Sequence, residues 1–276
     1  MAILSFEDQQ EKGPERMTQF SANLGLLWRE LDLPDAIHAA ARAGFDAVEC
    51  HWPYATPARE VASALADTGL AMLGINTSPG NREAGEFGLA ALPGREDEAH
   101  TAIEEALAYA EAIGAKAVHV MAGCATGREA EEVFVENLNH AVSLSASSGV
   151  MLLIEPLNPK DAPGYFLDGI ARAENIISTL ATPNLKLVFD CYHLALIEGE
   201  LEPLLEQYWH HIGHIQFAGV PDRGHPDKGS VDYPALFRHL DRMGYQAPLG
   251  AEYHPEGGDT GASLDWLKSY RQRATG

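Results

Sequence analysis

The feature that most constrains the fold of this 276-residue chain is a repeated alternation of short apolar runs and longer helix-like stretches. The eight apolar runs span residues 20–27, 47–52, 71–76, 117–121, 151–157, 185–191, 214–218 and 249–253. Between them lie stretches rich in Ala, Leu and Glu, and the longest of these, 96–113, repeats its apolar residues at the helical period. Uniformly apolar strands separated by helices are typical of a parallel sheet that is buried on both faces.

The number of these units favours one architecture. Eight strand–helix units in about 250 residues match a (β/α)8 barrel. A doubly wound open sheet is the competing fold, but no Gly-x-Gly-x-x-Gly turn follows the first run. We therefore predict a single α/β domain, a (β/α)8 TIM barrel, over residues 18–276. Residues 1–17 are polar and aperiodic, and we expect them to form a flexible N-terminal tail.

The charge and cysteine content exclude several classes of protein. With 19 Lys and Arg against 40 Asp and Glu, the net charge is −21, which would repel nucleic acid. The three cysteines form no Cys-x-x-Cys pair, so neither a disulfide framework nor a zinc finger is expected. No apolar run reaches the ~18 residues of a membrane span, and the N-terminus lacks the apolar core of a signal peptide. We expect a cytoplasmic protein that does not associate with membranes.

Oxygen-bearing side chains lie at the ends of four consecutive predicted strands. They are Glu155, Asp190, Gln216 and Glu252. In a barrel of this kind, catalytic groups lie at the C-terminal ends of the strands. Carboxylates packed together there repel one another unless a cation or shared protons offset the charge. We interpret the four residues as a metal site, and their oxygen atoms favour a hard divalent ion such as Mg²⁺ or Mn²⁺.

Two of these residues suit proton transfer, and neighbouring residues suit substrate binding. Glu155 and Glu252 could flank a substrate and move a proton next to a carbonyl, while a metal ion polarises the ketone. The substrate-binding candidates are His193, Arg223, His225 and Asn76. An Arg side chain binds carboxylates bidentately, so the expected partner is a small anionic hydroxy-keto acid or sugar acid.

We expect the other histidines near the predicted strands to have structural roles. They are His51, His119, His210, His211, His214 and His254. Histidines 210 and 214 have i,i+4 spacing, but no Glu follows the first of them as in the His-Glu-x-x-His zinc motif. None of the six is predicted to bind substrate or metal.

Several different short motifs lie along the chain. They are ARAGFDAVE at 41–49, GLAALPGR at 88–95, HVMAG at 119–123, EPLN at 155–158, PGY at 163–165, IGHIQ at 212–216 and LDRMGY at 240–245. In order and spacing they resemble the hydroxypyruvate isomerase family of xylose-isomerase-like barrels. The resemblance extends from about residue 20 to residue 266, which is nearly the whole chain.

The resemblance implies an activity and a role for each of the four strand-end residues. It implies that Glu155, Asp190, Gln216 and Glu252 are metal ligands, with Glu155 and Glu252 as the acid/base pair. The family reaction interconverts hydroxypyruvate and tartronate semialdehyde, an aldose–ketose isomerisation through an enediolate. Similar proteins isomerise 2-oxo-tetronates or epimerise ketoses at carbon 3, and these two reactions stay open as alternatives.

This chain departs from the family pattern on the substrate side. Cys50-His51-Trp52 precedes Pro-Tyr where the family has an aromatic and apolar stretch. Gly224-His225-Pro226 stands where His-Glu-Pro is usual, and Gly229-Ser230-Val231 replaces Gly-Glu-Ile. His254 lies where an Arg is frequent. The reaction type is therefore better determined than the substrate.

Two other classes of protein share features with this pattern. Metal-dependent endonucleases have the same barrel, but the charge of −21 and a Gln at position 216 oppose that function. A non-catalytic sugar-acid binding protein would not need the two proton-transfer residues Glu155 and Glu252. The sequence leaves both a monomer and a homo-oligomer open.

Overall fold

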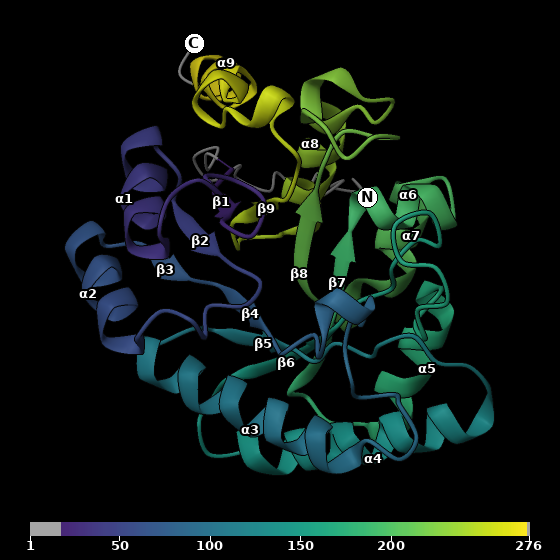
Figure 1. The fold of residues 1–276 in the computed structure, drawn as a ribbon. Coiled ribbons are helices and arrows are strands. Elements are labelled where there is room, and N and C mark those ends of the chain that lie inside the picture. The colour runs from purple at the N-terminus through teal and green to yellow at the C-terminus, as the bar shows by residue number, and fades with distance from the viewer. Residues whose placement is uncertain (1–17, 275–276) are drawn as a thin grey trace, which may run out of the picture.

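A computed structural model describes residues 18–274, which form a barrel of parallel strands surrounded by helices (Figure 1). The strands in chain order are β1 Phe20–Asn23, β2 Ala47–Glu49, β3 Ala71–Met72, β4 Gly74–Asn76, β5 Ala117–His119, β6 Met151–Ile154, β7 Leu185–Asp190, β8 Ile212–Phe217 and β9 Leu249–Ala251. Their order in the sheet is β3-β2-β1-β9-β8-β7-β6-β5-β4, and every pair is parallel. The tail predicted over residues 1–17 lies outside the described residues.

The strands β3 and β4 are two halves of one barrel strand, interrupted at Leu73. The half β3 pairs with β2, and β4 pairs with β5. Backbone hydrogen bonds bridge the interruption, because Leu73 N donates to Val48 O at 2.7 Å and Asn76 N donates to His51 O at 2.7 Å. The barrel therefore has eight strand positions, and the predicted (β/α)8 fold is confirmed.

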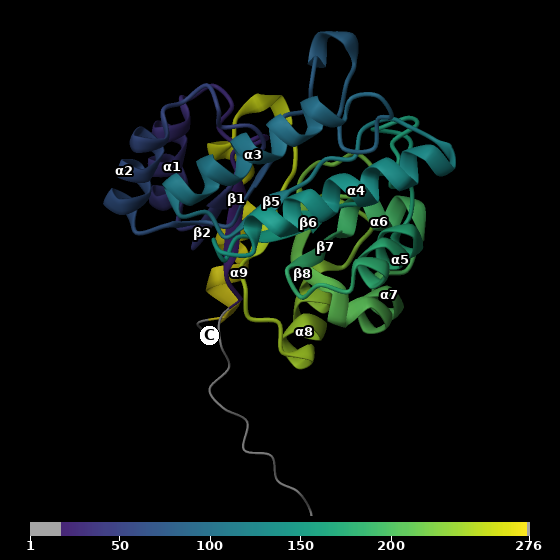
Figure 2. The ribbon, with the colours of Figure 1, turned by 90° about the horizontal axis from the view of Figure 1, so that it is seen from below.

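The helices cover the outside of the barrel (Figures 1 and 2). They are α1 Leu33–Ala43, α2 Ala58–Thr68, α3 Glu96–Ile113, α4 Gly127–Ser145, α5 Ile170–Leu180, α6 Cys191–Ile197, α7 Leu201–Tyr208, α8 Tyr233–Met243 and α9 Asp265–Ala274, with short 3-10 turns at Arg82–Ala84, Trp209–His211, Pro226–Lys228, Glu256–Gly258 and Gly261–Ser263. Three acidic residues begin α3, where they complement the positive end of the helix dipole, and Gly114 ends it at φ +71°. No helix of the described residues is long and apolar enough to cross a membrane.

An aromatic cluster joins the first strand to the last elements of the chain. The ring of Phe20 on β1 lies 5.8 Å from that of Phe217 on β8 and 5.2 Å from that of Trp266 on α9. Phe237 on α8 lies 5.5 Å from Phe20, and all four side chains are buried. These edge-on and tilted contacts, together with the buried apolar area, stabilise the barrel where β1 pairs with β9.

Candidate active site

The structure brings the four strand-end residues to one end of the barrel. Asp190 is the last residue of β7, Gln216 lies on β8, and Glu155 and Glu252 directly follow β6 and β9. In the sheet register Asp190 is aligned with Gln216, so their side chains share the inner face. Glu155, Gln216 and Glu252 line one cavity of about 30 Å³, and all four side chains are buried.

Three of these side chains have an oxygen with no hydrogen-bond partner in the described residues. Within residues 18–274, Glu155 Oε1, Asp190 Oδ2 and Gln216 Oε1 are buried and accept no hydrogen bond. Such atoms are rare in native interiors, because an unpaired buried polar atom costs about 1–3 kcal/mol. An oxygen set of this kind fits a hard divalent cation. Oxygens of Glu155 and Asp190 and a ring nitrogen of His193 all lie within 4.8 Å of one another, so the two carboxylates are close enough to share one ion.

Glu252 differs from the other two carboxylates because both of its oxygens have partners. Oε1 lies 2.7 Å from His51 Nε2, and Oε2 lies 3.1 Å from an Arg223 guanidinium nitrogen. Burial by itself would raise the pKa of Glu252, but the charge of Arg223 and the hydrogen bond with His51 outweigh it and lower that pKa. Glu252 is therefore held as a carboxylate.

The pKa values of Glu155 and Asp190, by contrast, are raised. Burial, together with the charges of Glu252 and Asp190, raises the pKa of Glu155 well above its ordinary value. Burial also raises the pKa of Asp190 to about 7, although the nearby Arg223 opposes that shift. The cavity thus holds carboxyl groups with different affinities for a proton, which is the arrangement that acid/base chemistry needs.

Arg223 lies at the site but is paired with protein carboxylates. Besides Glu252, its guanidinium approaches Asp190 Oδ2 at 3.8 Å and lies over the Tyr192 ring at 5.4 Å. Its backbone adopts φ +54°, which is uncommon for a residue other than glycine and directs this loop residue inward. The predicted contact of Arg223 with a substrate carboxylate stays a prediction.

The surroundings of His193 on α6 fix its protonation. Its Nδ1 lies 3.0 Å from Asn158 N and 2.7 Å from Asn158 Nδ2. The Asn158 amide cannot be turned over, because its Oδ1 accepts from the backbone nitrogens of Lys160 and Asp161, each at 3.0 Å. Since Nδ1 accepts two hydrogen bonds, a neutral imidazole carries its proton on Nε2.

The Nε2 atom of His193 is consequently a donor. Burial lowers the pKa of His193 to about 3, so the ring stays neutral near pH 7. In the described part of the chain, Nε2 has no hydrogen-bond partner, and it lies 3.9 Å from Asp190 Oδ2. A protonated ring nitrogen cannot ligate a metal, so the geometry suits a hydrogen bond to a substrate oxygen.

The remaining two candidates occupy different places. Asn76, at the end of β4, lines the same cavity as Glu155 and Glu252. His225 lies in the loop after β8, where its Nε2 accepts a hydrogen bond from Glu256 N at 3.4 Å. His225 does not line the cavity.

Three histidines that the sequence assigned to structural roles contact buried carboxylates in the barrel. His51 contacts Glu252, as described above. His119 Nδ1 lies 3.5 Å from Glu155 Oε2, and His214 Nε2 lies 2.7 Å from Glu49 Oε2. A usable signal was present for His214, because it precedes Gln216 by two residues on a strand and so shares its face. Glu49 was missed as well, although it ends β2 much as Asp190 ends β7.

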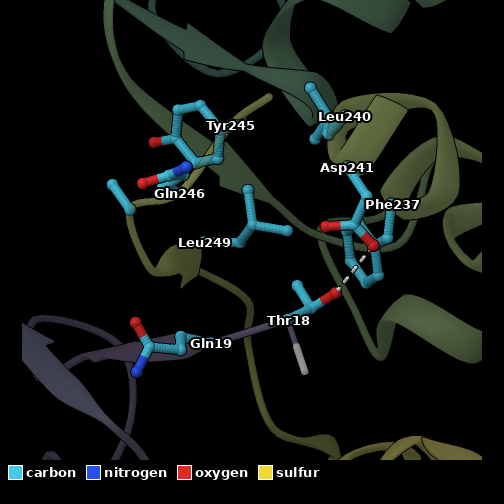
Figure 3. Close-up of a pocket in the computed structure, with 9 residues that line it drawn as sticks. Thr18, Gln19, Phe237, Leu240, Asp241, Tyr245, Gln246 and Leu249 are labelled. Atoms are coloured by element: carbon cyan, nitrogen blue, oxygen red, sulfur yellow. Dashed lines mark hydrogen bonds between the residues drawn. The ribbon is translucent and has the colours of Figure 1, made fainter. Parts of the chain in front are cut away.

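A larger pocket lies at the opposite end of the barrel (Figure 3). It has a volume of about 100 Å³ and is lined by residues before β1 and β9 and by α8, among them Gln19, Phe237, Leu240 and Tyr245. The Thr18 hydroxyl donates to Asp241 there at 3.4 Å. This pocket contains one carboxylate and no histidine, so the residues suited to chemistry lie at the other end.

Comparison with known proteins identifies a family and several relatives that this chain resembles. A family described as xylose isomerase-like TIM barrel matches residues 37–270. A 2-oxo-tetronate isomerase of Cupriavidus necator is 43% identical, over 93% of this chain and 100% of that protein. A putative hydroxypyruvate isomerase of Mus musculus is 42% identical, over 92% and 96%. A Brucella melitensis crystal structure described as an AP endonuclease of family 2 has a TM-score of 0.88 and 36% identity, over 92% and 99%.

Proposed function

Because the chain belongs to the xylose isomerase-like TIM-barrel family, we propose that it is an isomerase of small hydroxy-keto acids that transfers a proton between neighbouring carbons. The observation that carries the proposal is the pair Glu155 and Glu252, which line one buried cavity beside unpaired oxygens of Asp190 and Gln216. A binding protein would not need two carboxyl groups whose pKa values are shifted in opposite directions.

The proposed substrate is hydroxypyruvate, which is converted to tartronate semialdehyde. The reaction moves a proton from carbon 3 to carbon 2 and the hydroxyl proton from the oxygen on carbon 3 to the oxygen on carbon 2, so that the carbonyl moves from carbon 2 to carbon 3. A 2-oxo-tetronate undergoes the same shift with one more carbon at the far end. The name of the Cupriavidus necator relative favours this second substrate, and that of the mouse relative favours the first. A ketose 3-epimerase would share the proton-transfer pair but act on an uncharged sugar.

The residues present fit a divalent cation, Mg²⁺ or Mn²⁺. Oxygens of Glu155, Asp190, Gln216 and Glu252 would hold it, since a carboxylate oxygen that already accepts one hydrogen bond keeps a second lone pair. When bound, such an ion polarises the substrate carbonyl and stabilises the developing enediolate.

The chain's own residues supply the proton transfers. Glu252, held as a carboxylate by His51 and Arg223, is the base that accepts the proton from carbon 3. Glu155 takes up a proton from solvent at Oε1, which has no hydrogen-bond partner within the described residues, and delivers it to carbon 2, while Glu252 returns its proton to solvent. His193 donates from Nε2 to a substrate oxygen. In the reverse direction the two glutamates exchange roles.

The overall charge argues against the endonuclease suggested by the description of the Brucella structure. A net charge of −21 opposes the approach of DNA, and Gln216 offers an oxygen rather than an imidazole nitrogen. We also infer a cytoplasmic location. Cys50, Cys124 and Cys191 are all free thiols in the described chain, and the first and third are buried.

An exchange experiment in D2O tests the proposal. Purified protein supplied with Mg²⁺ or Mn²⁺ is incubated with hydroxypyruvate, 2-oxo-tetronates or ketoses, and product and C–H exchange are followed by NMR. We expect an isomerised acid that carries deuterium at the carbon next to the carbonyl. A chelator-treated sample is the control. Absence of both turnover and exchange with every substrate would contradict the proposed reaction.

A further inference from the structure

A buried contact across the barrel links Glu49 on β2 to two residues of β8. Glu49 Oε2 lies 2.7 Å from His214 Nε2 and 3.4 Å from Gln216 Nε2. All three side chains are buried, and all three line the cavity that also holds Glu155 and Glu252. The mechanism described above gives Glu49 no part.

The contact determines which end of the Gln216 amide faces Glu49. A glutamine side chain has an oxygen that accepts and a nitrogen that donates, whereas a carboxylate accepts only. Because Gln216 Nε2 donates to Glu49, Oε1 is directed away from Glu49. In residues 18–274 this Oε1 is buried and has no hydrogen-bond partner. A glutamate at position 216 would present oxygen in either orientation, so the need for an orienting acceptor arises from the amide.

The absence of a side chain at Gly250 on β9 leaves room for Glu49 in this position. A Cβ atom added to Gly250 would lie 2.3 Å from Glu49 Oε1, 2.7 Å from Gln216 Cγ and 3.0 Å from His214 Nε2. Gly250 is aligned with Gln216 in the sheet register. The absence of a side chain at this position therefore leaves the space in which the three groups meet.

We propose that Glu49 is a positioning residue that holds the side-chain amide of Gln216 with its oxygen toward the cation site. The inference rests on the proposed metal-assisted isomerase. His214 holds the carboxylate of Glu49 through the shorter of the two hydrogen bonds, and Glu49 in turn holds Gln216. Without the carboxylate the amide can turn over and present its NH2 group, which has no lone pair for a cation.

A double-mutant cycle on Mn²⁺ affinity tests this role. Calorimetry measures the Kd of the parent, Glu49→Gln, Gln216→Ala and the double variant. We expect Glu49→Gln to raise the Kd about 10–100-fold in the parent, the usual range for residues that orient metal ligands. In the Gln216→Ala background the same change should alter the Kd by less than about twofold, because there is no amide left to orient. An equal factor in both backgrounds would mean that Glu49 acts through its charge alone, and would overturn the proposal.

A second readout requires no metal. In ¹⁵N-glutamine-labelled protein, the Gln216 side-chain amide is assigned by its disappearance in Gln216→Ala. We expect its protons to exchange more slowly in the parent than in Glu49→Gln, because the hydrogen bond to a charged carboxylate is replaced by a weaker one to a neutral amide oxygen or is lost. Gly250→Ala, which displaces Glu49 without removing its charge, should give the same change if Glu49→Gln does not fold. Unchanged amide exchange in a folded variant would overturn the proposal.

The two readouts separate this inference from the proposed function. A parent protein that binds no Mn²⁺ or Mg²⁺ would overturn the cation site and the role of Glu49 together. A parent that binds the ion, but in which Glu49 and Gln216 are not coupled, would overturn the positioning role and leave the isomerase proposal intact.

Discussion

The two sides of the barrel contribute different things to the site. Strands β6 to β9 supply the oxygen-bearing groups, and three of these have an oxygen with no partner among the described residues. Strands β2 and β5 and the loop after β2 supply the side chains that contact them, namely Glu49, His119 and His51. The first set can bind and react. The second set contacts and orients the first, and His51 acts together with Arg223, from the loop after β8, to lower the pKa of Glu252.

The contacting side is distant in sequence from the groups that it orients. His51 and Glu252 are 201 residues apart, and Glu49 and Gln216 are 167 residues apart. A pattern within one strand can therefore reveal a reactive group but not its partner. The predictions below test whether the two sides divide their roles in this way.

Removal of either proton-transfer group should have the largest effect. Glu155→Gln and Glu252→Gln keep the shape of the side chain but cannot accept or deliver a proton, so kcat should fall ~10²–10⁴-fold. Glu132→Gln, at a side chain that is 61% exposed, is the matched control and should retain the parent kcat. Circular dichroism should show parent-like folding in all three. A near-parent kcat in a site variant would remove that glutamate from the proton transfer.

Removal of the His51 donor should have a smaller effect on rate and a visible effect on pH dependence. A hydrogen bond to a charged group contributes about 1.5–3 kcal/mol, so His51→Phe should lower kcat/KM roughly 10–100-fold. Because the bond lowers the pKa of Glu252, its loss raises that pKa, and the acid limb of the pH–rate profile should move to higher pH. His51→Gln keeps a donor, so its kcat/KM and its acid limb should both lie between those of the parent and those of His51→Phe. An unmoved acid limb in His51→Phe would contradict the orienting role.

Arg223→Ala should mainly affect substrate binding. If the guanidinium also reaches a substrate carboxylate, the KM for anionic substrates should rise about tenfold while kcat falls less. The KM change is measured for both hydroxypyruvate and an uncharged ketose. Loss of a contact with the substrate carboxylate raises only the KM for hydroxypyruvate, whereas loss of the partner of Glu252 affects both substrates. Equal KM changes for both would confine Arg223 to its contacts with Glu252 and Asp190.

The buried histidines should give the smallest effect, seen in stability rather than rate. Burial lowers the pKa of His119 to about 4 and that of His193 to about 3, so the unfolded chain binds protons below pH ~6.5 that the folded chain does not. Each therefore destabilises the fold as the pH decreases from about 6.5, by at most ~2 kcal/mol at pH 5. His119→Asn should lose less stability than the parent between pH 7 and 5 in urea unfolding. An identical loss in both proteins would show that His119 is protonated in the fold.

Much of the fold is visible in the sequence because barrel strands are buried on both faces. All eight predicted runs contain strands, although several strands are shorter than their runs. The run 20–27 yields β1 Phe20–Asn23, and Leu24 and Leu27 extend the apolar pattern because they are buried in the following loop. The interruption at Leu73 was missed, although Gly74 directly after it is a residue that weakens a strand and often marks an irregularity.

What the sequence by itself determined is which groups the barrel places at its reactive end. Glu155, Asp190, Gln216 and Glu252 follow or end strands, and in a parallel barrel all strands end on the same side. What only the tertiary structure decided is how each group is held. It paired Glu252 with His51, left Glu155 without a donor on Oε1, and turned the Gln216 amide against Glu49. The reason is physical, because strand position is local, whereas pKa and amide orientation depend on side chains brought into contact by closure of the barrel.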